Sequence, residues 1–237
     1  MTTINKPTDV VILTPEITKG MKSIGSKALL VSYSKMALIE YQIKYIRQYY
    51  PNSKITVLAG FEHDKIRKKI AKYNIRCSYN KDYEQNNQAA SVLLFMKTHN
   101  PSSLLIINGG VLLRSPLNCS ATAIYTIKTN LDHHRFDIGI AENTSSKNIQ
   151  YLFYGLPTKW IECIFLNKES LSLIIQLADK ISMDNLFLFE LINLLLEKNL
   201  AILNIPIQST SVLKINNRED LDRMRYFYDK NLSTKAK

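Results

Sequence analysis

The chain has 237 residues, of which 46% are hydrophobic and 22% are charged, an ordinary balance for a globular protein with one substantial core. Its formal net charge of +11 indicates attraction to nucleic acid, anionic membranes or acidic protein surfaces. The alternative is a basic surface that is simply solvated by water. The three widely spaced cysteines argue against a disulfide framework or a zinc site, and no apolar stretch approaches the ~18–20 residues that span a bilayer. With no signal-peptide pattern at the amino terminus, we expect a cytoplasmic protein.

The first half of the chain alternates short apolar runs with amphipathic segments. The runs predict buried, central strands at residues 9–14, 54–59, 75–79 and 104–107. The amphipathic segments predict helices over about 35–50, 63–73 and 87–98, and Ser34 is expected to cap the first of them. This alternation predicts a mostly parallel sheet with helices on both faces.

The second half is richer in strands. We expect strands at residues 122–128, 136–141, 150–154, 159–166, 201–205 and 212–215, and helices at 168–182 and 185–198, with a terminal helix opened by Asn217. The helix over 185–198 is apolar nearly all round, so it is either deeply buried or covered by a partner chain. Because no repeat or linker interrupts the sequence, we expect a single domain over residues 1–237.

Five short motifs occur in a fixed order along the chain. They are the strand Asp9–Thr14, Lys27-Ala28-Leu29-Leu30, Glu40-Tyr41-Gln42-Ile43, Tyr79-Asn80-Lys81-Asp82-Tyr83-Glu84 followed by Asn87 and Ser91, and Lys214-Ile215-Asn216 followed by Asp220-Leu221. Asn108-Gly109, at the end of a buried strand, is a further motif between the last two. In this order the motifs resemble the sugar-phosphate and phosphocholine nucleotidyltransferases with a GT-A-type fold. The resemblance implies a three-layer α/β/α domain with a mixed, mostly parallel sheet. Its nucleotide-binding-like half covers residues 9–113 and its acceptor-side half covers 114–232.

The same resemblance implies that the catalytic positions of the family have changed in this chain. The aspartates that hold Mg²⁺ in the family correspond here to Gly110 and Asn216, and neither offers an anionic oxygen. In the phosphate-binding loop, Glu16 and Thr18 stand at the glycine positions and Gly20 stands at the arginine position. We therefore expect no metal, no cofactor and no catalytic residue, unless Asp82, Glu84 or Glu162 supplies relocated ligands for Mg²⁺.

Four residues retain the chemistry of a residual anion or nucleotide site: Lys27, Asn87, Ser91 and Asn108. Lys27 matches the phosphate-contacting lysine of the family. The alternative readings are structural: a solvent-facing loop lysine for Lys27, a helix start for Asn87 and Ser91, and a strand-end turn for Asn108.

Three functions remain open at this point. The first is a nucleotidyltransferase-like pseudoenzyme that serves as a structural or binding component of a larger assembly, of which a virus or phage particle is one example. The second is an active Mg²⁺-dependent nucleotidyltransferase acting on a phosphosugar or phosphocholine. The third is a basic nucleic-acid-binding module. A cluster of cations on the predicted second helix could meet an acidic protein surface or a phosphate backbone: Lys65, Arg67, Lys68, Lys69 and Lys72.

Overall fold

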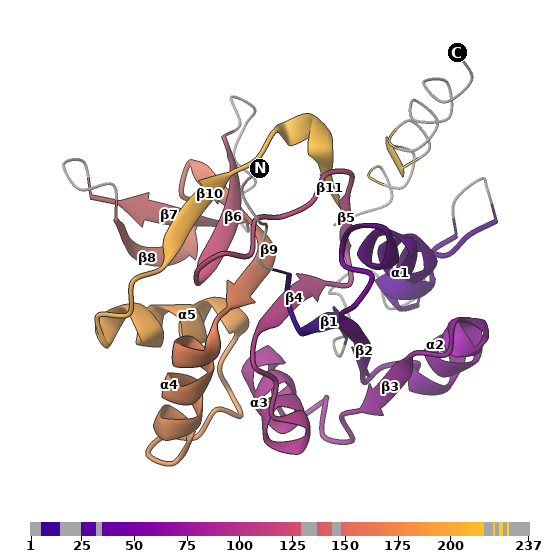
Figure 1. The fold of residues 1–237 in the computed structure, drawn as a ribbon, viewed down its shortest axis with the longest axis horizontal. Coiled ribbons are helices and arrows are strands. Elements are labelled where there is room, and N and C mark those ends of the chain that lie inside the picture. Colours follow the sequence, from indigo (N-terminus) through magenta and orange to yellow (C-terminus); the bar gives the residue numbers. More distant parts are fainter. Residues whose placement is uncertain are drawn as a thin grey trace.

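A nine-stranded mixed sheet runs through the middle of the molecule (Figure 1). The structure is a computed structural model that describes residues 6–14, 25–31, 35–128, 137–143, 148–215, 220, 223, 224 and 227. The strands lie in the order β10-β6-β9-β4-β1-β2-β3, and the β7–β8 hairpin joins β9. Their bounds are β1 Asp9–Thr14, β2 Lys54–Ala59, β3 Arg76–Tyr79, β4 Leu104–Asn108, β6 Ala123–Lys128, β7 Ile138–Glu142, β8 Ile149–Tyr154, β9 Thr158–Leu166 and β10 Leu203–Pro206.

The four strands of the first half are parallel neighbours, as the alternating pattern predicted. Strand β9 then runs antiparallel between β4 and β6, which makes the sheet mixed. The expectation that all four early strands lie at the centre is wrong for β3, which pairs only with β2 and forms the edge of the sheet. Consistent with that place, none of its four residues is buried.

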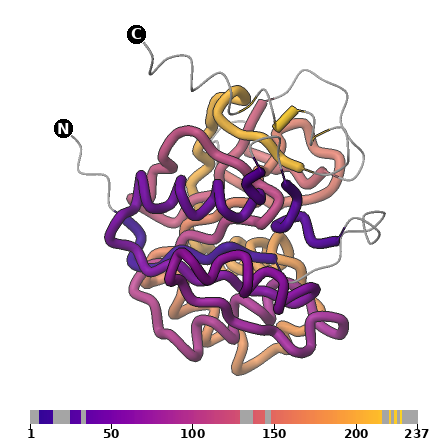
Figure 2. Tube along the Cα trace, turned by 90° about the vertical axis from the view of Figure 1, so that its right-hand side faces the viewer, coloured from indigo at the N-terminus to yellow at the C-terminus, as the bar shows by residue number. Residues whose placement is uncertain are grey.

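Helices cover both faces of the sheet, so the domain has three layers. The α-helices whose bounds fall inside the described ranges are α1 Leu38–Tyr49, α2 His63–Ile70, α3 Gln88–His99, α4 Lys168–Ala178 and α5 Leu188–Glu197. Alternate residues of β1 point to opposite faces: Val10 and Ile12 join the core beneath α1 and α2, while Val11 joins the core beneath α3, α4 and α5. Figure 2 turns the side with α1 and α2 toward the viewer.

The first helix begins later than the sequence suggested. It starts at Leu38, and the carboxylate of Glu40 accepts a hydrogen bond from the Ala37 backbone N–H at 2.8 Å. The expected cap, Ser34, lies outside the described residues. Glu40 thus closes the start of the helix in the way a capping-box acid does.

The apolar helix α5 is buried by this chain itself. Its side chains share one core with β8, α3 and α4, and five of them are buried: Leu188, Phe189, Leu191, Ile192 and Leu195. Burial within the fold therefore explains its composition without a partner chain. None of the helices in the described part of the chain has the length and apolarity needed to cross a bilayer.

The sequence predicted a strand over residues 212–215, and the structure confirms it but pairs it in a short ribbon that was not expected. Strand β5 (Val111–Leu113) follows β4 after a turn and pairs antiparallel with β11 (Val212–Lys214). The terminal helix predicted from Asn217 falls mostly outside the described residues. The ribbon brings residues 212–215 back beside the turn that follows β4.

Candidate functional site

The carboxyl ends of four parallel strands meet at one edge of the sheet. Thr14 of β1 pairs with Ala59 of β2, and Ala59 pairs with Tyr79 of β3. Leu13 pairs with Asn108 at the end of β4. Open α/β sheets bind ligands at this edge, so the residues around the β4 turn are the place to look for a site.

Hydrogen bonds fix the turn that follows β4. The side-chain oxygen of Asn108 accepts from the Gly110 backbone N–H at 2.8 Å, and the Gly109 N–H donates to the Leu13 carbonyl at 2.8 Å. The side-chain amide of Gln42 donates to the Asn108 carbonyl at 2.9 Å. The side-chain oxygen of Asn108 is thus engaged in the turn itself, as the alternative structural role for this residue predicted.

Gly110 is enclosed by Lys27 and the late ribbon. A Cβ atom at Gly110 would lie 3.2 Å from the Lys27 Cδ, 3.2 Å from the Ile215 carbonyl oxygen and 3.3 Å from the Asn108 Oδ1. We refer to Lys27, Asn108, Gly110 and the Ile215 carbonyl as the Gly110 site. The structure therefore brings together three of the predicted positions, and it places beside them the residue that precedes Asn216. Asn216 itself lies outside the described residues.

The Gly110 site does not fit Mg²⁺. Gly110 offers no carboxylate, and the aliphatic stem of Lys27 lies only 3.2 Å from where a Cβ atom would stand. Among the residues that the structure describes, no three His, Cys, Asp or Glu side chains come together as a metal site. Mg²⁺ needs hard, preferably anionic oxygens, and a lysine ammonium beside it is repulsive. The loop positions Glu16, Thr18 and Gly20 fall outside the described ranges.

A group of four charged side chains, which we call the charged network, lies next to this site. Lys214 Nζ is 2.5 Å from Glu162 Oε1 and 3.3 Å from Asp137 Oδ1. Lys159 Nζ is 2.8 Å from the other oxygen of Asp137. The Lys214 backbone pairs with Val111 of β5, the residue after Gly110. The network thus contains two cations and two carboxylates, all partly buried.

The ion pairs determine the protonation of the network. Burial would raise the pKa of Asp137, but Lys159 and Lys214 outweigh it and hold that pKa below its usual value. Burial would likewise lower the pKa of Lys214, but Glu162 and Asp137 reverse the direction and raise it. Lys214 is therefore a permanent cation at neutral pH, and Asp137 is a permanent anion.

Asn87 and Ser91 hold a loop and a neighbouring segment in place. Ser91 is 2% exposed and accepts a hydrogen bond from the Asn80 side-chain amide at 2.8 Å. The Asn87 side chain donates to the Asn185 carbonyl at 2.6 Å. These contacts connect α3 to the loop after β3 and to the segment before α5. They serve local structure, whereas Lys27 lies at the Gly110 site.

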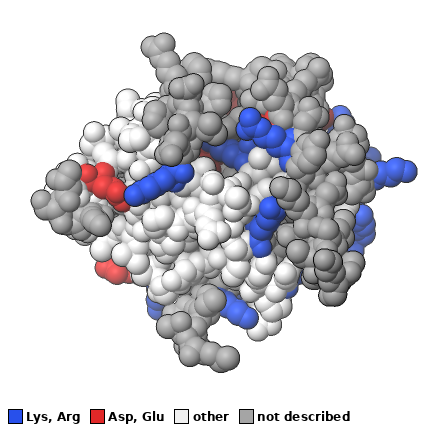
Figure 3. All heavy atoms as spheres, turned by 90° about the horizontal axis from the view of Figure 1, so that it is seen from above, with Lys and Arg blue, Asp and Glu red and all other residues white. Residues whose placement is uncertain are grey.

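The cations of α2 and of the short 3-10 helix that follows it (Ala71–Tyr73) are largely engaged in ion pairs with the chain's own acids. Lys69 and Lys72 contact Glu40 at 3.2 and 2.6 Å, Lys65 contacts Glu62 at 2.5 Å, and Arg67 contacts Asp64 at 3.4 Å. Only Lys68 of the predicted cluster has no such pair among the described residues. On the face drawn in Figure 3, Lys and Arg side chains lie in separate groups rather than in one patch. The positive charge of the described residues on this face is thus dispersed.

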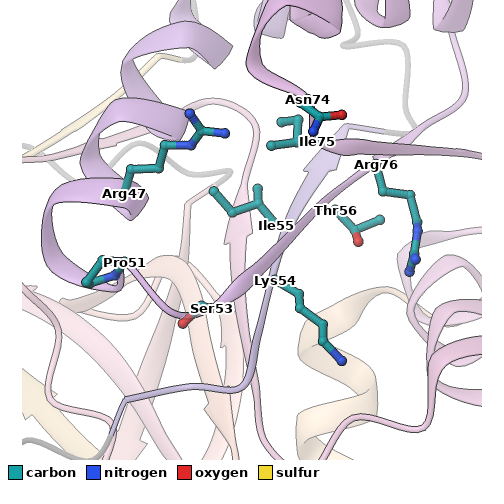
Figure 4. A pocket seen from close by; sticks show the side chains of 9 residues that line it. All are labelled: Arg47, Pro51, Ser53, Lys54, Ile55, Thr56, Asn74, Ile75 and Arg76. Atoms are coloured by element: carbon teal, nitrogen blue, oxygen red, sulfur yellow. The ribbon is translucent and has the colours of Figure 1, made fainter.

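A basic hollow of about 590 Å³ lies at the opposite edge of the sheet (Figure 4). Lys54 and Arg76 are the first residues of β2 and β3, and Arg47 comes from the last turn of α1. Figure 4 shows Arg47 on one side of Ile55 and Ile75, with Lys54 and Arg76 on the other. The described residues that line the hollow include these three cations and no carboxylate.

One signal for the charged network was visible in the sequence. Lys214 is a basic residue two positions before Asn216 in the late motif. Glu162 was a candidate for a relocated metal ligand, and the structure instead pairs it with Lys214. Nothing in the local sequence around Asp137 and Lys159 indicated that they belong to this network, because residues distant in the sequence form it.

Comparisons with known proteins agree on the fold. The sequence matches no protein-family model and no curated protein. The structure is similar to that of CTP:phosphocholine cytidylyltransferase from Streptococcus pneumoniae, with a TM-score of 0.74 and 16% identity, covering 93% of this chain and 98% of that chain. It is also similar to the inositol-1-phosphate CTP transferase from T. maritima, with a TM-score of 0.74 and 12% identity over 95% and 96% of the two chains.

A nucleoside-diphosphate-sugar pyrophosphorylase from Vibrio cholerae is similar as well, with a TM-score of 0.70 and 13% identity over 92% of this chain and 99% of that chain. Identities this low establish the fold and not the activity. The chain has a GT-A-type nucleotidyltransferase fold, which confirms the expectation drawn from its five motifs.

Proposed function

We propose that this chain is a nucleotidyltransferase-fold protein that has lost metal-dependent catalysis and acts as a binding component of a larger assembly. The observation that carries the proposal is the enclosure of Gly110, where Lys27 and the Ile215 carbonyl stand around a residue without a side chain. A metal that neutralises the reacting phosphate contributes several kcal/mol, and each ~1.4 kcal/mol is a factor of ten in rate. Without that metal, nucleotidyl transfer should fall by several orders of magnitude.

The Gly110 site retains the means to hold an anion. Lys27 supplies a positive charge, and the backbone of the adjacent turn is fixed by the Asn108 side chain. A phosphate or sulfate bound there would need no divalent ion. Because a lysine acts as a point charge and a partly exposed contact is screened, the binding should be weak and should decrease as salt is added.

An assay of product formation tests the loss of catalysis. The purified chain is supplied with the common nucleoside triphosphates and phosphorylated sugar or choline acceptors, with Mg²⁺ or Mn²⁺, and we expect no product above background. The alternative is an active enzyme with relocated ligands. Robust turnover that disappears in Asp82→Ala or Glu84→Ala would establish that alternative and refute the proposal.

Anion binding is tested separately with Lys27→Ala. Inorganic pyrophosphate titrated calorimetrically should bind the wild type in a metal-independent way and bind Lys27→Ala about tenfold less tightly. The exposed Lys180→Ala serves as the matched control and should bind like the wild type. An affinity unchanged by Lys27→Ala, or one that rises with Mg²⁺, contradicts this part of the model.

An exposed apolar edge supports the role of a binding component. Among the described strands, β8 pairs with β7 alone; it contains no charged residue and leaves Tyr151 and Phe153 48% and 56% exposed. Tyr154 continues the aromatic surface and stacks edge-on against Phe189 at a centroid distance of 5.4 Å. Proteins usually protect such an edge with charges or proline, so we expect another protein chain to cover it.

Phe153→Lys tests whether this surface is used. The wild type should co-purify with a protein partner from its native source, and Phe153→Lys should lose that partner while keeping the circular dichroism of the wild type. Lys168→Ala, a surface change at the start of α4, is the control. If the wild type stays monomeric and co-purifies with nothing, the assembly role is wrong.

The basic hollow favours one further candidate, a nucleic-acid-binding module. Three cations without a carboxylate in its lining suit a phosphate backbone. A labelled single-stranded oligonucleotide should then bind with an affinity that falls steeply as salt rises, and Arg76→Ala should reduce the slope by about one unit. No binding at low salt would remove this candidate.

A further inference from the structure

We propose that the Lys214 ammonium is a built-in cation, which fills a two-carboxylate site beside Gly110 and makes this end of the sheet independent of divalent metal ions. The proposal deepens the proposed loss of metal-dependent catalysis. Lys214 Nζ lies 2.5 Å from Glu162 Oε1 and 3.3 Å from Asp137 Oδ1. One positive charge is thus shared by carboxylates from two separate segments of the chain, as a bound metal ion would share its ligands.

The position of the ammonium follows from the strand registers. Lys214 pairs with Val111, and the next residue, Ile215, donates its N–H to the Gly110 carbonyl at 2.8 Å. On the other side, Cys163 of β9 pairs with Ile107 of β4. Continuing that antiparallel register places Glu162 opposite the end of β4, where the turn to Gly110 begins. Both partners of the ion pair therefore flank the same turn.

Glu162 is held in a backbone conformation that favours glycine. Its φ angle is +57°, in the left-handed region, and the pairing of β6 with β9 is irregular between Ile124 and Thr126. A non-glycine residue in this region costs of order 1 kcal/mol and persists where its surroundings fix it. The ion pair with Lys214 helps to fix Glu162 in this backbone conformation. The strained conformation in turn positions the carboxylate beside the ammonium.

The charges explain why a cation is required here. The side chains of Asp137, Glu162 and Lys214 are 14%, 21% and 22% exposed, so water screens them incompletely. Two carboxylates at such a place repel each other and raise the free energy of the fold unless a cation stands between them. Lys159 contacts one oxygen of Asp137, and Lys214 contacts the other together with Glu162 Oε1.

The competing explanation is that the ion pairs only hold the segments together and that Lys214 does not take the place of a metal ion. Both explanations predict that loss of Lys214 lowers the stability of the fold, because the network connects β9, β11 and the residue before β7. They differ in what a divalent ion does to the variant. A cation site emptied of its lysine should accept a metal ion and recover stability, whereas a simple clamp should not.

The test compares Mn²⁺ binding by electron paramagnetic resonance in the wild type and in Lys214→Ala. The wild type should bind no Mn²⁺ at this place, and Lys214→Ala should bind one ion with a Kd of about 0.1–1 mM, a range typical of sites with few carboxylates. The double variant Lys214→Ala with Glu162→Gln should lose the ion again. Lys180→Ala is the control for removing a positive charge elsewhere and should behave like the wild type.

Thermal unfolding with and without Mn²⁺ gives a second readout. Mn²⁺ should raise the Tm of Lys214→Ala and leave the wild type unchanged. If Lys214→Ala does not fold, Lys214→Gln takes its place, and failure of both to fold at any Mn²⁺ concentration counts against the proposal. A folded variant that gains no Mn²⁺, or a wild type whose Mn²⁺ binding depends on Glu162, overturns it. Turnover by the wild type with Mg²⁺ would instead refute the proposed function, so the two failures are distinguishable.

Discussion

Glu40→Gln should destabilise the fold by roughly 2–3 kcal/mol at pH 7. The Glu40 side chain is 1% exposed and joins α1 to the end of α2. It accepts from the Ala37 backbone N–H at 2.8 Å and contacts Lys72 and Lys69 at 2.6 and 3.2 Å. Burial would raise the pKa of Glu40, but these partners outweigh it and lower the pKa from 4.5 to about 2.

The magnitude follows from that shift. The fall in pKa from 4.5 to about 2, at ~1.4 kcal/mol for each tenfold change in proton affinity, corresponds to about 3.5 kcal/mol of stability, and the exposure of Lys72 to solvent reduces this to roughly 2–3 kcal/mol. Because the folded pKa is depressed, this stability is fully present above pH 4.5 and is lost as the pH falls toward 2. The difference between wild type and Glu40→Gln should therefore shrink by roughly half between pH 7 and pH 3.

Urea unfolding followed by circular dichroism measures both effects. Glu190→Gln is the matched control, because Glu190 accepts from the Phe187 backbone N–H at the start of α5 at the same 2.8 Å, with no ion pair to a lysine among the described residues. The control should cost about 1 kcal/mol or less. If the two variants lose equal stability, or if the Glu40→Gln loss is the same at pH 7 and pH 3, the lysine contacts do not supply the stabilisation.

Three further outcomes are expected. Gly139→Ala should cost about 2–3 kcal/mol in urea unfolding, because its Cβ would lie 2.5 Å from the Leu156 carbonyl oxygen; a neutral effect would contradict that packing. Ser91→Ala should lower the free energy of unfolding by about 1–2 kcal/mol by the same measurement, because Ser91 accepts a hydrogen bond from the buried Asn80 amide. The affinity for pyrophosphate should stay unchanged, and a weakened affinity would show that Ser91 belongs to the binding site. Burial raises the pKa of Cys77 to about 11, so its alkylation at pH 8, followed by mass spectrometry, should be roughly a hundredfold slower than that of a free thiol, and an equal rate would contradict the burial.

Much of the fold could be predicted because its signals are local. The apolar run of β1 and the 3–4 spacing in α1 mark which residues face the core, since one period describes one face of an element. The absence of an acid at position 110 is likewise visible in the sequence. The position of β3 at the edge could not be predicted, because the sequence of a four-residue strand does not indicate whether one or two strands pair with it.

The sequence by itself determined the alternation of strands and helices, the resemblance to a GT-A-type domain and the loss of an acid at Gly110. Only the tertiary structure decided which charges meet. Lys214 reaches Asp137 across 77 positions of sequence because β11 returns to pair with β5. Glu40 captures two cations of the α2 segment because both helices pack on the same face of the sheet. Such contacts depend on strand order and register, which long-range packing fixes and local periodicity does not encode.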